Sequence, residues 1–312
     1  MALAAILRFE QSTKFKSFKQ FNLEQPAAFK EAMQDDKNKR TGKPLSKATI
    51  DATLRHVKTF FHWLAGENGY KSRISYSHAA YFNNNAKDAR AAHARRETPF
   101  PTLEQCDHTF RLMPTETETQ RRNKALFAFL MLTGARDGAI ASFKLKHINL
   151  SDECVFQDAR DTKTKSSKTF TTWFLPVDKM YHESFYSWVE YLRTEKLFGN
   201  DDALFPKPKM GLGVAGGFAN LGLSRECYAN ATVIREAIKA AFVNAGLSAF
   251  GPHSFRKTLA VYGDTICRDR ESYKAWSLNL GHDSIITTVG AYHPIPVSRQ
   301  AEIIKGMRKQ KK

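Results

Sequence analysis

The chain has 312 residues, of which 42% are hydrophobic and 12% aromatic, so it can build two globular domains and is too apolar to be a disordered tail. Lys and Arg number 48 against 31 acidic residues, a net charge of +17, which favours a polyanionic partner bound in a salt-dependent way. A ribosomal or membrane-surface protein could carry the same charge, so charge alone leaves those classes open. No apolar run approaches the roughly 18 residues of a membrane helix, and we expect no membrane-spanning segment.

The N-terminal third has the pattern of a basic helical domain. Residues 1–97 hold 18 basic and 9 acidic side chains, a net +9 of the total +17. Ser46 is placed to cap a helix that ends near Gly66 and Gly69. Its apolar residues recur at a helical period. Its polar face is either an ordinary solvated surface or, together with the basic run that ends at Arg40, a DNA-binding surface. The apolar residues are Ile50, Leu54, Val57, Phe61 and Leu64, and the polar face carries Lys47, Arg55, His56 and Lys58.

A change of composition separates this region from the rest of the chain. Residues 84–101 combine small and charged residues with Pro99 and Pro101, which is typical of a linker. Arg95 and Arg96 would place positive charge on that linker, where it could contact DNA. We therefore expect a helical DNA-clamping domain over 1–90, a linker over 91–101 and a catalytic domain over 102–312.

The pattern after residue 102 predicts a mainly α fold with a small β-sheet, an α+β architecture. An apolar helix over 125–132 ends at Gly134, and a short helix follows near 138–144. Strands are predicted over 154–157 and 169–175, on either side of a lysine-rich turn. The stretch 205–230 is predicted to be a loop or insertion. The remaining helices are predicted over 180–196, 231–245, 254–267, 271–279 and 284–291.

The cysteines and the N-terminus indicate the compartment. The four cysteines are widely spaced, without a Cys-x-x-Cys pair or zinc-finger spacing, so we expect reduced thiols and no metal site. The start of the chain lacks the basic region and cleavage site of a secretory signal. We therefore expect a cytoplasmic protein associated with the nucleoid. The cysteines are Cys106, Cys154, Cys227 and Cys267.

Side chains suited to phosphodiester chemistry recur in the last two-thirds of the chain. Two arginines could grip the non-bridging oxygens of a phosphodiester, because their planar forks match phosphate geometry. A tyrosine oxygen is a competent covalent nucleophile, and Lys and His can transfer protons. Such a set could break and remake a DNA strand without a metal or any other cofactor. The residues are Arg136, Lys163, His253, Arg256, His282 and Tyr292.

The order of these residues resembles the catalytic domain of the tyrosine recombinases, the phage integrase family. The resemblance rests on Thr-Gly-Ala-Arg at 133–136, His-Ser-Phe-Arg at 253–256 and Leu-Gly-His at 280–282, followed by Tyr292. It covers essentially the whole chain, with the strong motifs in 125–293, and residues 1–97 match the family's core-binding domain only as a helical pattern. It implies a site-specific DNA recombinase.

The resemblance also implies a role for each residue. Tyr292 would attack the scissile phosphate and form a 3′-phosphotyrosine, while Arg136 and Arg256 would bind the non-bridging oxygens. Lys163 would protonate the departing 5′-oxygen. His253 would assist proton transfer at the tyrosine, and His282 would donate a hydrogen bond to the phosphate.

Some positions depart from the family pattern or leave a choice open. The family often has an acidic residue three positions after the first arginine, where this chain has Ala139, with Asp137 nearby. Lys163 is favoured over Lys165 as the catalytic lysine by the Thr-Lys-Thr match. Lys165 and Lys257 are further candidates for DNA contact.

The resemblance implies partners and leaves two other functions open. Four protomers would assemble on double-stranded recombination sites and exchange strands through a Holliday junction. The segment Ser298 to Lys309 would reach a neighbouring protomer or, as a frayed basic terminus, touch DNA. Accessory DNA-bending or directionality factors would fit the same activity. The alternatives are a type IB topoisomerase and a catalytically silent DNA-binding protein of the same fold.

Overall fold

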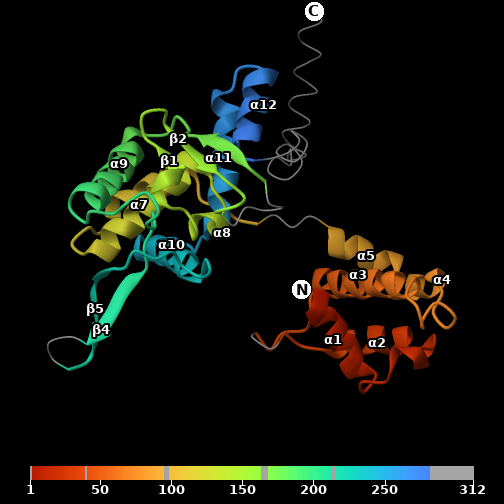
Figure 1. The fold of residues 1–312 in the computed structure, drawn as a ribbon. Coiled ribbons are helices and arrows are strands. Elements are labelled where there is room, and N and C mark those ends of the chain that lie inside the picture. The colour runs from red at the N-terminus through yellow and green to blue at the C-terminus, as the bar shows by residue number, and fades with distance from the viewer. Residues whose placement is uncertain (1, 39–40, 95–97, 163–167, 213–215, 282–312) are drawn as a thin grey trace, which may run out of the picture. The chain divides into compact units, whose positions relative to one another are not determined.

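The structure is a computed structural model that describes residues 2–38, 41–94, 98–162, 168–212 and 216–281 (Figure 1). The chain divides into two compact units, Met1–Thr98 and Pro99–Lys312. Among the described residues, no helix is both long enough and apolar enough to cross a membrane.

The first unit is helical. Its core gathers around Phe9, whose ring meets those of Phe29, Phe61 and Phe82 edge-on at centroid distances of 5.2–5.3 Å. Such edge-to-face contacts suit the quadrupoles of aromatic rings, and these side chains are almost fully buried. The elements are α1 (Ala2–Ser12), η1 (Phe18–Gln20), α2 (Glu24–Asp35), α3 (Lys47–Leu64), α4 (Tyr76–Ala79), η2 (Ala80–Phe82) and α5 (Ala86–His93).

Helix α3 confirms the predicted amphipathic helix. Ser46 caps it, because its hydroxyl accepts a hydrogen bond from the backbone N–H of Thr49 at 3.1 Å. The five apolar residues predicted to face the core are all buried. The expectation of a linker from residue 84 was wrong in part, since α5 occupies 86–93. Asn85 caps α5, and an Asx cap followed by alanines overrides the linker-like composition.

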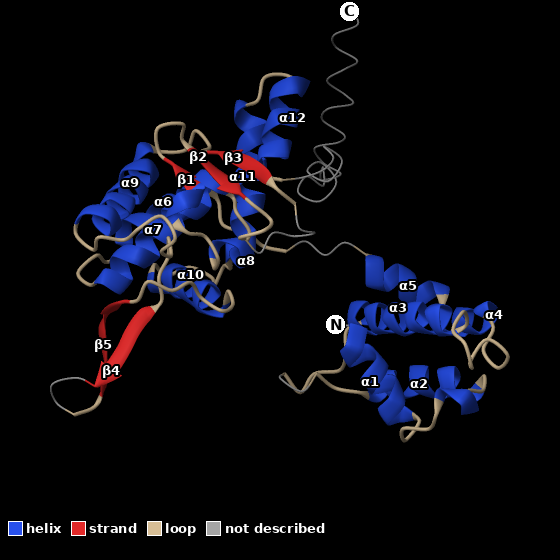
Figure 2. Cartoon of the chain, viewed as in Figure 1, coloured by secondary structure: helices blue, strands red, loops and turns tan. Residues whose placement is uncertain are grey.

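Helix α7 lies among the other elements of the second unit (Figure 2). Its side chains are buried along most of its length. Helix α9 and the small sheet pack against α7, and the backbone N–H of Leu175 bonds to Leu132 O at 2.7 Å. The elements are α6 (Leu103–Leu112), α7 (Glu118–Thr133), α8 (Asp137–Ile140), η3 (Leu145–His147), β1 (Ile148–Asn149), β2 (Cys154–Gln157), β3 (Phe170–Trp173), α9 (Lys179–Thr194), β4 (Pro208–Leu212), β5 (Phe218–Leu223), α10 (Thr232–Asn244), α11 (Pro252–Ile266) and α12 (Arg270–Asn279).

The sheet is antiparallel, with β1 next to β2 and β2 next to β3. Val155 of β2 pairs with Ile148 on one side and with Thr172 on the other, and its side chain is fully buried. The predicted strands on either side of the lysine-rich turn are present as β2 and β3. The predicted helix over 284–291 lies outside the described residues.

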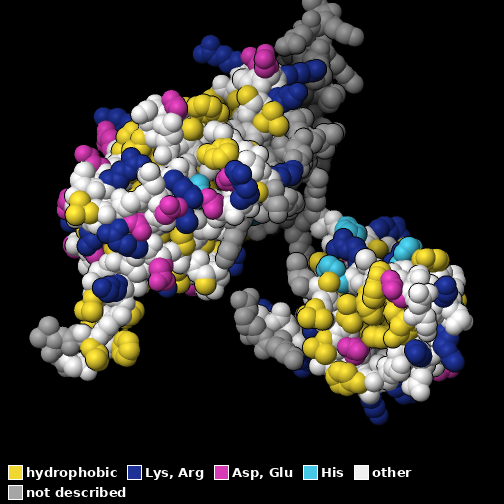
Figure 3. Space-filling view, viewed as in Figure 1, with side chains coloured by type: hydrophobic (Ala, Val, Ile, Leu, Met, Phe, Trp, Pro, Cys, Tyr) yellow, Lys and Arg dark blue, Asp and Glu magenta, His cyan; other side chains and the backbone are white. Residues whose placement is uncertain are grey.

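The prediction of a loop or insertion over 205–230 was wrong in part, because two strands lie within it. Strands β4 and β5 pair there as an antiparallel hairpin that projects from the body of the second unit. Large apolar side chains are exposed along the hairpin, as Figure 3 shows in yellow. The many glycines of this stretch weaken the strand pattern, because glycine has low strand propensity and no side chain to pack. The exposed side chains are Met210, Leu212, Phe218 and Leu221.

Candidate active site

Arg136 is positioned by a left-handed turn at the end of α7. Gly134 adopts φ +56°, which glycine tolerates best, and its N–H bonds to Leu130 O at 2.8 Å. The hydroxyl of Thr133 accepts from the N–H of Ala135 at 3.1 Å, which holds the chain after the turn. Arg136 then begins α8 in an extended conformation and is half-buried.

Arg256 lies one turn into α11 and is 2% exposed. Pro252 occupies the first turn of α11, where its missing N–H costs no hydrogen bond. The guanidinium of Arg256 donates from Nη1 to Gly134 O at 2.6 Å and from Nη2 to Leu280 O. A buried cation thus connects the turn before Arg136, helix α11 and the end of α12.

The segment that follows α12 approaches Arg136 at Gly281. Gly281 adopts φ +70°, and a Cβ there would lie 3.8 Å from Nη1 of Arg136 and 3.0 Å from Cζ of Phe170. Both the left-handed backbone and the close approach to the Phe170 ring therefore favour a glycine here. Leu280 and Gly281 are the first two residues of the Leu-Gly-His motif, so parts of all three sequence motifs meet at the two arginines.

His253 lies in the field of both arginines. Partial burial lowers the pKa of its imidazole, and the positive charges of Arg256 and Arg136 lower it further. The carboxylate of Asp137 acts in the opposite direction. His253 is therefore neutral near pH 7 and can accept a proton. Arg136, His253 and Arg256 therefore lie close enough to one another for their charges to interact, and their catalytic roles stay predictions.

Hydrogen bonds fix the residues at both ends of the β2–β3 turn. Both the N–H and the hydroxyl of Thr162 donate to Asp158 O, at 2.7 and 2.6 Å. On the other side, the N–H of Ala159 donates to Oγ1 of Thr169 at 3.1 Å. The carboxylate of Asp158 accepts hydrogen bonds from Arg160, which lower the pKa of Asp158 to about 2. The predicted catalytic lysine follows directly after Thr162.

Several predicted site residues lie outside the described part of the chain, and their roles stay predictions. They are the candidate nucleophile, one histidine, both candidate catalytic lysines and three arginines expected to contact DNA. These are Tyr292, His282, Lys163, Lys165, Arg40, Arg95 and Arg96.

The remaining candidates for DNA contact differ in their surroundings. Lys47 donates to Asp88 of α5 at 2.9 Å, and this hydrogen bond lowers the pKa of Asp88. Arg55 is exposed and Lys58 half-buried on the polar side of α3. In the second unit, Nζ of Lys257 lies 5.9 Å from the ring centroid of Phe100. Lys47 therefore already has an acidic partner within its own unit.

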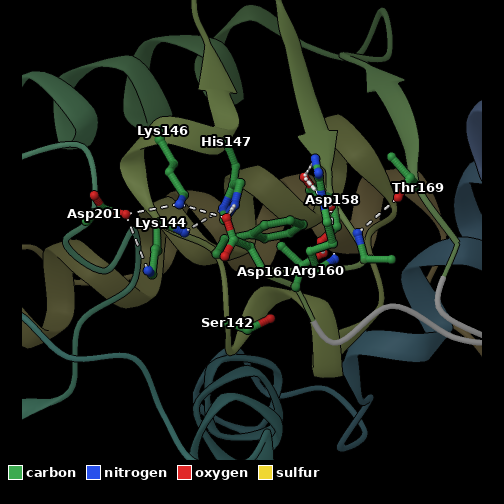
Figure 4. Close-up of polar contacts among 12 residues, drawn as sticks. Ser142, Lys144, Lys146, His147, Asp158, Arg160, Asp161, Thr169 and Asp201 are labelled. Atoms are coloured by element: carbon green, nitrogen blue, oxygen red, sulfur yellow. Dashed lines mark hydrogen bonds and ion pairs between the residues drawn. The ribbon is translucent and has the colours of Figure 1, made fainter.

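Other polar residues of this region were missed from sequence. Asp137, which follows the first arginine, forms an ion pair with Arg235 of α10. A charged cluster also joins η3 to the β2–β3 turn, with Lys146 and Asp161 at its centre (Figure 4). The sequence signal for this cluster was the density of Lys and His just before β1, close to acids after β2. No group of three or more His, Cys, Asp or Glu side chains arranged for a metal ion occurs among the described residues.

Residues 104–294 match the phage integrase family. Because this match spans more than half of the chain, the protein belongs to that family, whose members are DNA breaking-and-rejoining enzymes. The resemblance seen in the motifs is thereby confirmed. A comparison with curated proteins returned no match.

Solved structures share the fold. A lambda integrase dimer bound to a COC′ core site matches with a TM-score of 0.62 and 15% identity, covering 94% of this chain and 87% of that one. XerH recombinase bound to a palindromic difH substrate gives 0.60 and 19%, covering 97% and 77%. The Tn1549 transposon integrase in complex with transposon right end DNA gives 0.58 and 13%, covering 98% and 92%. The expected fold class, mainly α with a small sheet, is confirmed.

Proposed function

We propose that the protein is a site-specific DNA recombinase that cuts and rejoins double-stranded DNA through a 3′-phosphotyrosine intermediate. The observation that carries this proposal is the convergence of Arg136 and Arg256 at the backbone of Leu280 and Gly281, with the imidazole of His253 close enough for both positive charges to lower its pKa. From there the chain continues into the segment that contains Tyr292. A site-specific DNA reaction would take place in the cytoplasm, at the nucleoid.

Each described residue has a task that its surroundings support. Arg136 is half-buried and accessible to a phosphate, whereas Arg256 is held by two carbonyl oxygens that orient its guanidinium. Donors fixed in this way stabilise charge that develops on the non-bridging oxygens, without reorganising during the reaction. The lowered pKa of His253 leaves a neutral imidazole able to accept the tyrosine proton.

The proposed reaction balances without an external energy source. The oxygen of Tyr292 forms a bond to phosphorus while the bond from phosphorus to the 5′-oxygen breaks. The tyrosine proton passes to His253, and Lys163 gives a proton to the departing 5′-oxygen. The rejoining step reverses these transfers with a different 5′-hydroxyl, so the number of phosphoester bonds is conserved.

Strand exchange between two sites requires several protomers, and we propose a homotetramer in which a C-terminal segment docks on a neighbour. The second unit offers an apolar groove between β3, the end of α11 and α12, where Trp173, Ile266 and Leu278 are exposed by 56%, 36% and 50%. The segment 298–309 carries apolar residues that suit such a groove. Deleting residues 298–312 should therefore prevent assembly on DNA. Unchanged tetramers and recombination would remove this part of the proposal.

The decisive experiment is covalent trapping on nicked suicide substrates drawn from the DNA that flanks the gene. The wild type should form an adduct that maps to Tyr292, in buffer containing EDTA. The Tyr292→Phe variant should bind the same DNA with equal affinity and form none. An adduct at another residue would mean that the nucleophile is misassigned.

The same material separates the alternatives. Relaxation of supercoiled plasmid that lacks the recovered site would indicate a topoisomerase. Tight binding to the library without any adduct or strand exchange would argue for a silent DNA-binding protein.

A further inference from the structure

A charged cluster connects η3 to the turn between β2 and β3 (Figure 4). The carboxylate of Asp161 lies 2.7 Å from Nζ of Lys146 and 3.8 Å from Nε2 of His147. Hydrogen bonding to Lys146 lowers the pKa of Asp161, so this acid is charged at neutral pH. The cluster therefore joins two segments through opposite charges.

Helix η3 provides a fixed support for the cluster. Its backbone N–H groups at Leu145 and Lys146 donate to Asp202 O at 3.0 Å and to Asn200 O at 2.8 Å. The ammonium of Lys146 also lies 3.0 Å from Oδ1 of Asp201. Backbone and side chain together restrain Lys146, so less side-chain freedom is lost when it binds Asp161.

His147 contributes a hydrogen-bond donor that points toward Asp161. It is 4% exposed, and its Nδ1 accepts a hydrogen bond from the N–H of Lys144 at 2.9 Å. This bond assigns the proton of the neutral imidazole to Nε2, and burial lowers the pKa so that the neutral form prevails. Nε2 is buried, and among the described residues it has no hydrogen-bond partner. Asp161 is the acceptor toward which it lies, and a shift of roughly 1 Å would complete the bond.

The partner of this cluster is a short, internally bonded stretch of backbone. The N–H groups of Asp161 and Thr162 both donate to Asp158 O, at 3.1 and 2.7 Å, and Thr162 is 4% exposed. A displacement of the Asp161 side chain would thus move the stretch as a unit. Lys163 follows Thr162 in the sequence.

We propose that Asp161, held by Lys146 and His147, is a positioning residue that sets the location of the lysine which protonates the departing 5′-oxygen. The idea rests on the proposed function, in which Lys163 or Lys165 supplies that proton. Asp161 contacts neither DNA nor the reacting atoms in this role. It acts by anchoring the N-terminal side of the turn, so its loss misplaces the proton donor without weakening phosphate binding.

The test compares single-turnover cleavage of two matched suicide substrates, one with a normal 5′-oxygen and one with sulfur in its place at the scissile phosphate. A thiolate needs far less help from an acid than an alkoxide does, because a thiol has a pKa of roughly 8.5. Asp161→Asn should slow cleavage of the oxygen substrate by roughly 10- to 100-fold, within the ~10²–10⁴-fold that a positioned acid supplies. It should cleave the sulfur substrate at nearly the wild-type rate.

Further variants test the route through the cluster. Lys146→Gln should show the same substrate-dependent defect, and the double variant should be no slower than either single one, because both remove the same contact. Asp161→Glu keeps the carboxylate and should restore part of the rate. Asp152→Asn is the matched control: it removes an acid of the β1–β2 turn that bonds to Asn149 and not to Lys146, and its rate should stay within about twofold of wild type.

The outcomes separate this idea from the proposed function. An Asp161→Asn defect of equal size on both substrates, or a wild-type rate on the oxygen substrate, would overturn the positioning role. Failure of the wild-type protein to cleave even the sulfur substrate would instead refute the proposed function. Arg256→Ala should be slow on both substrates, which verifies that sulfur rescues only the protonation step.

Discussion

Replacing Gly134 with alanine tests the turn that aligns the two arginines. The backbone there has φ +56°, and an added Cβ would lie 2.7 Å from Cδ2 of Leu280 and 3.2 Å from Cδ1 of Leu259. The left-handed conformation costs an L-residue about 1–2 kcal/mol, and overpacking a core costs about 1–3 kcal/mol. The sum is about 2–5 kcal/mol, because both side chains that would have to move are buried.

The matched control is Gly246→Ala. Gly246 has φ +75° with nothing within 4 Å of the added Cβ, so it incurs the conformational cost alone, about 1–2 kcal/mol. Differential scanning calorimetry of the full chain should show the transition of the second unit lowered by roughly 4–20 °C for Gly134→Ala, and by less for the control. Equal shifts for the two variants would refute the packing part of the argument.

Three further predictions concern individual charges. Arg256→Lys should slow single-turnover cleavage by at least ~10²-fold, because an ammonium cannot reproduce the planar guanidinium that two carbonyl oxygens orient. An unchanged cleavage rate would exclude a role of Arg256 in phosphate binding. The pKa of His253 is lowered from 6.5, so the cleavage rate should be constant near pH 7 and fall on acidification below 6.5, and His253→Gln should remove that acid limb from the pH–rate profile. The same shift destabilises the fold at low pH: the unfolded chain binds the proton more readily, so stability rises with pH until 6.5 is passed. Arg55→Ala should reduce the slope of log Kd against log salt concentration by about 1, whereas Lys47→Ala should reduce it less because Asp88 already neutralises that ammonium. Equal slopes for the two variants in filter-binding titrations would contradict this distinction.

Local pattern was enough to predict helices in both units. Ser46 and the apolar period that follows it specify α3, and Gly134 marks the end of α7, because capping and left-handed turns depend on adjacent residues. The spacing of His253 and Arg256 likewise identified residues that meet in the fold. The hairpin β4–β5 was missed, since its glycine-rich strands are specified by pairing with each other and carry little strand propensity.

The amino-acid sequence by itself determined the family, the order of the motifs and the chemical types of the site residues, because these are properties of short stretches. Only the tertiary structure decided which groups those residues contact. Arg256 bonds to Gly134 and Leu280, which lie 122 and 24 positions away, and Asp137 pairs with Arg235 rather than with the adjacent arginine. Contacts over such separations follow from the packing of helices around a common core, which no local propensity encodes.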